Sequence, residues 1–281
     1  MAVSLLASDP SDWRIYQVAL VSTYPPHVNI RVDRQMLAAL IKEKGALFAR
    51  WTDNWDCDIQ SCFWYVIKDS FVPLENMLAK QRSEIKRGLK NCDVRMVTRE
   101  YIENFGYTVY MKAFASYSTH LEPMTETDFK NAIGASENSE FWAVFIRDTD
   151  LFIAYSHNIL QDEVCHYSTI KFDPDCLNLY PGYALIHTMN EVYLRDRGFK
   201  YVSDGARNIS HDTNIQDYLI KKFGFRRAYC RLNILYRPDI AVIVNVLFPF
   251  RKLFSHAKAG ILAKVASVLG QEEMRRGTRL S

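Results

Sequence analysis

Polar side chains of the types used in proton transfer follow a predicted strand near residue 200. The segment KYVSDG, residues 200–205, is typical of a buried strand that ends in an acidic residue and a glycine. The polar residues that come next, before a helical pattern begins, are Arg207, Asn208, His211 and Asp212. A strand can be joined to a helix by about two to six residues. We therefore interpret the longer polar segment as one wall of a substrate groove.

Asp204 and His211 are the candidates for handling a proton in that groove. A carboxylate at a strand end can position or deprotonate an attacking amine, and an imidazole can act as a base near neutral pH. Both residues also have a structural interpretation. An Asp before Gly often binds the amides of its own turn, and a loop histidine can belong to a helix cap.

Two further histidines stand on adjacent predicted strands, His157 in AYSHN and His166 in VCHYS. They could flank the same cleft, and His166 is a third catalytic candidate. Histidines on strands are, however, often structural groups whose hydrogen bonds are satisfied within the protein.

Basic residues form a stripe on a predicted helix over 74–91. Arg82, Lys86 and Lys90 recur at intervals of four, and Arg87 lies beside them. Such a face could bind the phosphates of a nucleotide-linked or RNA-linked substrate. It could equally be the solvated face of an amphipathic helix.

Acidic pairs and cysteines give no sign of a metal centre. The segments DCD at 56–58 and DPD at 173–175 lack a third ligand at a suitable spacing, so we predict turns and no metal site. Six cysteines are scattered along the chain without a CxxC motif. This pattern favours reduced thiols in a cytoplasmic protein.

The composition fits a globular protein with one large domain, or with one large domain and an appendage. The chain has 281 residues, 48% of them hydrophobic, and a net charge of +3, which is too small to predict a strong affinity for nucleic acid or anionic membranes. The start lacks the pattern of a secretory signal, and the longest apolar run, residues 240–250, is too short to span a membrane. The basic, apolar pattern of residues 248–269 could contact a membrane surface, or could pack over a sheet edge of the same chain.

The periodicities predict an α+β protein with a mixed sheet. We expect an N-terminal α/β extension over 1–92, a domain over 93–237, and a helical segment over 238–281. In the extension, a strand is predicted over 12–20, followed by a helix that Asp33 caps and Gly45 ends. In the middle domain the expected order is β-α-α-β-β-β-α-β-α-β. Its strands are predicted at 94–98, 140–147, 151–160, 163–172, 200–204 and 226–236, and its helices at 99–117, 125–135, 181–198 and 214–224. Thr125 is the expected cap of the second helix, and short polar turns separate the second, third and fourth strands.

This order resembles the GNAT acyltransferase fold, and two motifs are similar to those of Fem-type aminoacyltransferases. The first comprises SDGARNIS and YLIKKFGF, with Asp204 and Gly205 at the strand end and Lys222, Phe223 and Gly224 at the helix end. The second is the helix LAKQRSEIKRGLKNC, where the matching residues are Arg82, Ile85, Lys86 and Arg87. The resemblance covers about residues 74–236.

The resemblance implies how an acyl donor would be held. The strand over 163–172 would part from the next strand, and backbone amides of residues 166–170 would stabilise the oxyanion. The turn formed by Tyr180, Gly182, Tyr183 and Ala184 would bind the donor phosphates, together with Lys222, and Tyr218 would act as a general acid.

The sequence departs from the family pattern at three positions in this region. Leu179 stands where a basic residue is usual, and Pro181 removes a backbone donor. Ile220 occupies the usual tyrosine position, two residues after Tyr218.

The resemblance implies an acyltransferase that moves an acetyl or aminoacyl group to an amine. The acceptor would be a small molecule or a precursor of the cell envelope or of a polysaccharide, and the donor would be acetyl-CoA or another acyl-CoA. A second hypothesis keeps the chemistry but uses aminoacyl-tRNA as the donor. A third is a GNAT-like module that has lost catalysis and serves as an interaction or scaffold protein.

Overall fold

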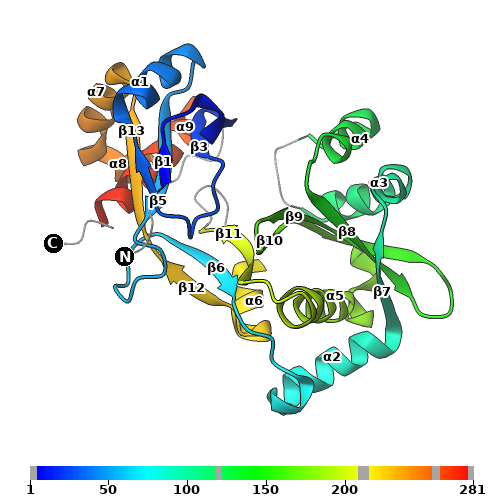
Figure 1. The fold of residues 1–281 in the computed structure, drawn as a ribbon. Helices are drawn as coiled ribbons and strands as arrows, with labels where there is room; N and C mark the ends of the chain where they lie inside the picture. The colour runs from blue at the N-terminus through cyan, green and yellow to red at the C-terminus, as the bar shows by residue number, and fades with distance from the viewer. Residues whose placement is uncertain (1–4, 118–121, 208–214, 255–259, 278–281) are drawn as a thin grey trace. The chain divides into compact units, whose positions relative to one another are not determined.

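The computed structural model describes residues 5–117, 122–207, 215–254 and 260–277 (Figure 1). The chain forms two compact units. The first contains the described residues within 1–65, 206–213 and 227–281, and the second contains those within 66–205 and 214–226. The boundaries predicted after residues 92 and 237 stay a prediction.

The first unit contains a four-stranded sheet with the order β13-β5-β3-β2. Its strands are β2 (Trp13–Tyr16), β3 (Ala19–Ser22), β5 (Phe48–Asp53) and β13 (Arg231–Tyr236). A short parallel pair, β1 (Leu5–Ala7) and β4 (Ile30–Val32), lies outside it. Helix α1 (Arg34–Glu43) begins at Asp33, whose carboxylate accepts hydrogen bonds from two amides of the first turn, and Gly45 follows its end with φ +65°. This start and stop match the sequence prediction.

The C-terminal helices belong to the same unit. They are α7 (Pro238–Leu247), α8 (Arg251–Phe254) and α9 (Gly260–Gly277). Helix α9 packs on the edge strand β13, where Tyr236 donates a 3.0 Å hydrogen bond to the buried Glu272. Coverage of a sheet edge was one of the two sequence-based alternatives. Val242, Val246 and Leu253 remain exposed on α7 and α8, and their contact with a membrane stays a prediction.

The second unit is built on a seven-stranded mixed sheet with the order β12-β6-β11-β10-β9-β8-β7. Its strands are β6 (Trp64–Lys68), β7 (Cys92–Val97), β8 (Ser139–Ile146), β9 (Phe152–Gln161), β10 (Val164–Phe172), β11 (Tyr201–Ala206) and β12 (Arg226–Tyr229). Strands β7 to β10 pair antiparallel in chain order, and β10 pairs parallel with β11. The expected α+β class with a mixed sheet is confirmed.

Helices cover both faces of this sheet (Figure 1). On one face lie α3 (Arg99–Ala115) and α4 (Glu126–Gly134), which bury a cluster containing Ile102, Phe129 and Tyr155. On the other face lie α2 (Ala79–Asn91) and α5 (Pro181–Asn190), which continues into a π-helical turn, Glu191–Asp196. Helix α6 (Ile215–Phe223) follows β11.

Two predicted strands were wrong in extent. The segment 226–236 is two strands, because the chain leaves the seven-stranded sheet as β12 and, after Cys230, enters the four-stranded sheet as β13. The segment 12–20 is a hairpin of β2 and β3, and Gln17 takes φ +55° in its turn. In both segments β-forming residues continue through the break, so composition alone hides it.

Candidate active site

The expected parting of two parallel strands is present in the seven-stranded sheet. Strands β10 and β11 pair through Val164–His166 and Tyr201–Ser203, and within the described residues their register ends there. Strand β10 runs on to Phe172 beside β9, with a register shift between Tyr167 and Thr169. Beyond His166 this part of β10 therefore pairs on one side only. The role predicted for the amides of residues 166–170 stays a prediction.

Asp204 lies one residue beyond the last pair of that register. Because side chains alternate along a strand, it points to the face opposite Ser203 and His166, where its carboxylate accepts a hydrogen bond from Gln216 of α6. Burial raises the pKa of Asp204 to about 7, and the hydrogen bond from Gln216 opposes the rise only in part. Asp204 therefore changes charge near neutral pH.

His166 is held against the end of the neighbouring strand. Its Nδ1 donates a 3.1 Å hydrogen bond to the carbonyl of Ser203, and its ring lies over Gly205. A Cβ at Gly205 would be 3.0 Å from the ring, and φ at this glycine is +88°. Glycine thus allows the histidine to approach. His166 and Asp204 project from opposite faces, so the structure does not bring these two predicted catalytic side chains together.

His211, the other proposed base, lies outside the described residues. His157 lies on β9, and its Nε2 is 2.8 Å from the hydroxyl of Ser136 and 2.9 Å from that of Ser139. Burial lowers the pKa of His157 to about 4, with smaller contributions from the charges of Arg99 and His166. His157 is therefore neutral at physiological pH.

Aromatic side chains fill the space between α5 and α6. The Tyr183 ring centroid is 5.6 Å from those of Tyr218 and Phe223, and the Tyr218 and Phe223 centroids are 5.5 Å apart. A Cβ at Gly182 would lie 3.4 Å from the Tyr218 hydroxyl. Burial raises the pKa of Tyr218, and the adjacent Tyr183 and Glu84 add to the rise. Tyr218 is therefore a neutral, packed residue at this position.

The predicted phosphate-binding turn uses much of its own hydrogen-bonding capacity. Tyr180 has φ +63°, and its carbonyl accepts from the amides of Tyr183, at 3.1 Å, and Ala184, at 3.3 Å. Helix α2 approaches this carbonyl so closely that a Cβ at Gly88 would lie 2.6 Å from it. Pro181 has no N–H to offer. Of the amides in the first turn of α5, that of Gly182 is therefore the one that does not donate to the Tyr180 carbonyl.

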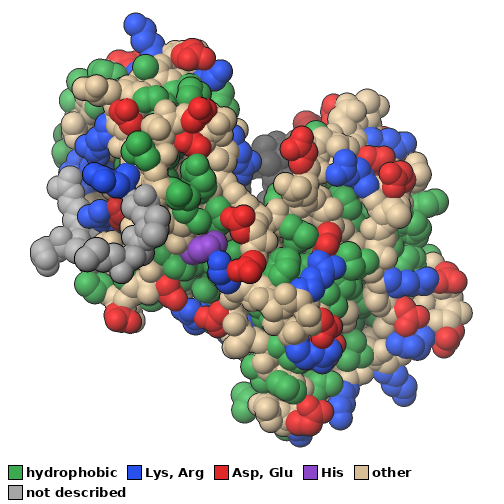
Figure 2. Space-filling view, viewed as in Figure 1, with side chains coloured by type: hydrophobic (Ala, Val, Ile, Leu, Met, Phe, Trp, Pro, Cys, Tyr) green, Lys and Arg blue, Asp and Glu red, His purple; other side chains and the backbone are tan. Residues whose placement is uncertain are grey.

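The basic residues near this turn separate into two groups. Lys222 forms an ion pair with Glu84, with Nζ 3.1 Å from both carboxylate oxygens. Arg82 is half-buried and donates to the carbonyl of Glu75 at 3.4 Å. In contrast, Lys86, Arg87 and Lys90 are exposed on α2, where Lys and Arg side chains gather in Figure 2.

The guanidinium of Arg87 lies 4.7 Å from the centroid of the Tyr180 ring. A positive charge therefore stands next to the start of α5, although Leu179 itself is uncharged. The sequence placed Arg87 in a helical stripe and gave no sign of this contact, because the two residues are far apart in the chain.

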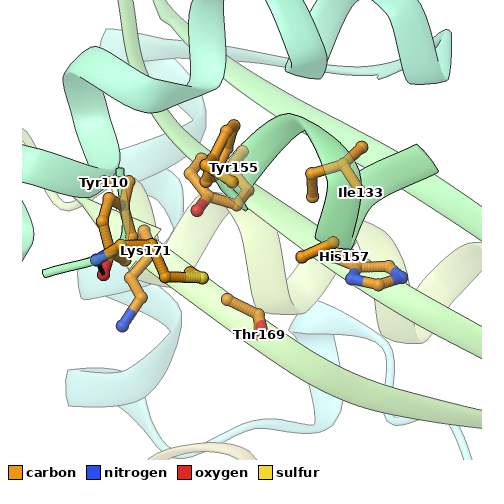
Figure 3. A pocket seen from close by; sticks show the side chains of 9 residues that line it. Tyr110, Ile133, Tyr155, His157, Thr169 and Lys171 are labelled. Atoms are coloured by element: carbon orange, nitrogen blue, oxygen red, sulfur yellow. Dashed lines mark hydrogen bonds between the residues drawn. The ribbon is translucent and has the colours of Figure 1, made fainter. Parts of the chain in front are cut away.

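A cavity of about 310 Å³ lies between α3, α4 and the strands β9 and β10 (Figure 3). Tyr110, Phe129 and Ile133 line it from the helices, and the strands contribute His157, Thr169 and Lys171 together with Tyr155. Of these residues only His157 had been considered from the sequence. The sequence did contain a signal for this cavity, because polar residues stand at alternate positions of two otherwise buried strands.

The acidic pairs at 56–58 and 173–175, which the sequence predicted to be turns, contain residues with local structural roles. Asp173 is 5% exposed, caps the short helix η3 (Pro174–Leu179) and lies 2.5 Å from the ammonium of Lys112. Asp56 has φ +53°. Within the described ranges, no group of three or more His, Cys, Asp or Glu side chains is arranged to hold a metal ion. None of the described helices is long and apolar enough to cross a membrane.

Comparisons with known proteins identify the fold. No family model matches the sequence, and no curated protein matches it. The solved structure of FemX matches with a TM-score of 0.52 and 11% identity, covering 82% of this chain and 85% of that one. The C-terminal domain assigned to a lysylphosphatidylglycerol synthetase from Agrobacterium fabrum matches with a TM-score of 0.50 and 14% identity, covering 84% of both chains. At these identities the likeness shows the fold alone: the chain folds like FemX and this domain, as the Fem-type resemblance of the sequence predicted.

Proposed function

We propose that the protein transfers an acyl group to an amine of a cell-envelope or polysaccharide precursor, with an aminoacyl ester as the donor. The observation that carries the proposal is Asp204, a half-buried carboxylate at the point where β10 and β11 part, with a pKa of about 7. A base is most effective when its pKa lies near the working pH. FemX and the lysylphosphatidylglycerol synthetase domain, which share the fold, support aminoacyl transfer as the class of reaction.

In the proposed step the amine nitrogen of the acceptor attacks the acyl carbonyl. The new C–N bond forms as the ester C–O bond breaks, and Asp204 takes the proton that the amine loses. Asp204 then passes this proton to the departing ester oxygen, which leaves as a hydroxyl group, so that the step balances. Backbone amides of residues 166–170 would stabilise the negative charge that develops on the carbonyl oxygen.

Three contacts favour an aminoacyl ester over coenzyme A as the donor. The amides of Tyr183 and Ala184 are bonded to the Tyr180 carbonyl, and the Tyr218 ring packs between α5 and α6. Lys222 is paired with Glu84. A pyrophosphate at this turn would have to displace these contacts. The exposed residues Lys86, Arg87 and Lys90 could instead contact the phosphates of a charged tRNA.

The choice of donor can be tested by binding. We expect charged tRNA to bind the parent protein, and to bind the triple variant Lys86→Ala/Arg87→Ala/Lys90→Ala more weakly. Because the variant lacks three contacts with phosphates, the slope of the logarithm of the association constant against the logarithm of salt concentration should become less steep by about two to three. The matched control is Arg34→Ala/Lys42→Ala/Lys44→Ala, which removes three exposed positive charges from α1 and the residue after it. Calorimetry with acetyl-CoA and desulfo-CoA completes the comparison.

The possible results separate the hypotheses. Micromolar binding of acetyl-CoA without binding of tRNA would contradict an aminoacyl donor and favour an acyl-CoA enzyme. Binding of neither donor would contradict acyl transfer and favour a non-catalytic module.

A further inference from the structure

The cavity between α3, α4, β9 and β10 contains an unusual polar group. Tyr155 is 1% exposed, and its hydroxyl faces the cavity (Figure 3). No described residue forms a hydrogen bond with this hydroxyl, whereas the nearby Tyr110 hydroxyl accepts one from the amide of Met124 at 2.9 Å. Because this hydroxyl is open to the cavity and not sealed within the core, it is available to donate to an acceptor atom of a bound ligand.

The cavity has two chemically different walls. The helices contribute the apolar side chains of Phe129 and Ile133, while the strands contribute polar groups. Tyr155 pairs across the strands with Lys171, and His157 pairs with Thr169. A ligand would therefore place apolar atoms against the helices and acceptor atoms against the strands.

The charge of the cavity excludes one kind of ligand. Lys171 is its only charged lining residue within the described ranges, and its ammonium lies 3.0 Å from the Tyr117 hydroxyl and 4.7 Å from the centroid of that ring. His157, which also lines the cavity, is neutral, since burial lowers its pKa to about 4. No described acidic residue lines the cavity, so a cationic group would meet repulsion without compensation.

Size and position limit the ligand further. Ligand pockets typically begin at about 300 Å³, so a cavity of this volume suits one side chain rather than a nucleotide. Thr169 of its wall belongs to the segment 166–170 of β10, whose amides would hold the acyl carbonyl. A group attached to that carbonyl can therefore reach the cavity.

We infer that this cavity binds the side chain of the transferred acyl group and selects an uncharged apolar one, aromatic or branched aliphatic, over a cationic one. The inference rests on the proposed function for the identity of the ligand as an acyl group. The cavity's preference for uncharged apolar groups rests on its lining alone.

The selectivity can be measured without a donor or an acceptor. The probes are N-acetyl-L-phenylalaninamide, N-acetyl-L-leucinamide and N-acetyl-L-lysinamide, titrated into the full chain and followed by NMR. We expect the first two to bind at least about tenfold more tightly than the third. Equal binding of all three, or no binding of the apolar probes, would overturn the inference.

Variants of the residues that line the cavity test whether the apolar probes bind there. Ala132→Trp, at an exposed position of the lining, should fill the cavity and abolish apolar binding, while the neighbouring control Asn131→Trp should not. Tyr155→Phe should weaken binding about fivefold to tenfold. Lys171→Glu should admit the lysine probe. Unchanged binding in Ala132→Trp, with both tryptophan variants folded, would place the ligand elsewhere and refute the inference.

Transfer experiments separate this inference from the proposed function. If the protein transfers lysyl groups as readily as phenylalanyl groups, the proposed function stands and the selectivity is wrong. If the apolar probes bind in the cavity but no aminoacyl group is transferred from any charged tRNA, the proposed function fails. The inferred role in holding an acyl group then fails with it.

Discussion

Two buried tyrosines on opposite faces of the seven-stranded sheet differ in how completely their hydroxyls are satisfied. Tyr193, in the π-helical turn that continues α5, is fully buried. Its oxygen accepts from Trp142 at 2.9 Å and from Asn158 at 3.3 Å, and it donates to Glu140 at 2.8 Å. Tyr155, beneath α3 and α4, is almost as buried and faces the cavity. The polar groups of the first face are bonded among themselves, while the second face keeps a hydroxyl that is open to the cavity and free to bond a ligand.

The comparison distinguishes polar groups that stabilise the fold from polar groups that are available to a ligand. Glu140 is also held by Arg197, with distances of 2.7 and 2.9 Å, so the Tyr193 network is complete without any partner molecule. Complete networks stabilise and specify a fold, whereas the Tyr155 hydroxyl is open to the cavity and takes part in no such network among the described residues. Asp204 is the exception on the closed side, because its burial disfavours the charged form.

The largest effect is expected for the charge of Asp204. Because the pKa in the folded state is raised from 3.8 to about 7, the native protein binds more protons than the unfolded chain between these values. This group's contribution to stability is therefore lost as the pH rises, by up to about 4 kcal/mol by pH 7. Urea unfolding of the parent and Asp204→Asn across this pH range should show the loss in the parent alone. If the free energies of unfolding of the two proteins changed with pH in parallel, the prediction would be contradicted.

A smaller loss is expected when the closed network is opened. Tyr193→Phe removes the hydroxyl that joins Trp142, Asn158 and Glu140, and leaves buried polar atoms without their partner. We expect the free energy of unfolding to fall by about 2 kcal/mol. Equilibrium urea unfolding measures the change, and a loss below about 0.5 kcal/mol would show that the network is not the stabilising element described.

The smallest effect is expected at the open face. Tyr155→Phe deletes a hydroxyl that makes no described hydrogen bond, so the free energy of unfolding should change by less than about 0.5 kcal/mol. The pair of Tyr→Phe variants thus tests the comparison directly. A loss as large as that of Tyr193→Phe would mean that Tyr155 has a structural partner and would remove the reason for placing a ligand beside it.

The sequence predicted the second unit more accurately than the first. The cap at Thr125 and the short turns between β8, β9 and β10 are local signals, and the corresponding elements are present. The break at Cys230 depends on which sheet each half of the segment joins. That choice is made by tertiary contacts, such as those of β13 with β5.

At the candidate site too, local sequence signals could be predicted and tertiary contacts could not. Asp204 could be found because it follows a strand and precedes a glycine. The contact of Arg87 with Tyr180 and the shared cavity wall of Phe129 and Tyr155 join segments that are far apart in the chain. In β10, the shift of register between Tyr167 and Thr169 also changes which later side chains face the cavity, and no local pattern announces it.

The measurement that tests the central claim most directly follows label from donor to acceptor. The parent protein and Asp204→Asn are incubated with an extract of envelope precursors and either tRNA charged with labelled amino acids or labelled acetyl-CoA. We predict that the parent moves label from charged tRNA to an amine, and that Asp204→Asn does so about 10²-fold to 10⁴-fold more slowly. Equal transfer by both proteins, or transfer by neither, would contradict Asp204-dependent acyl transfer.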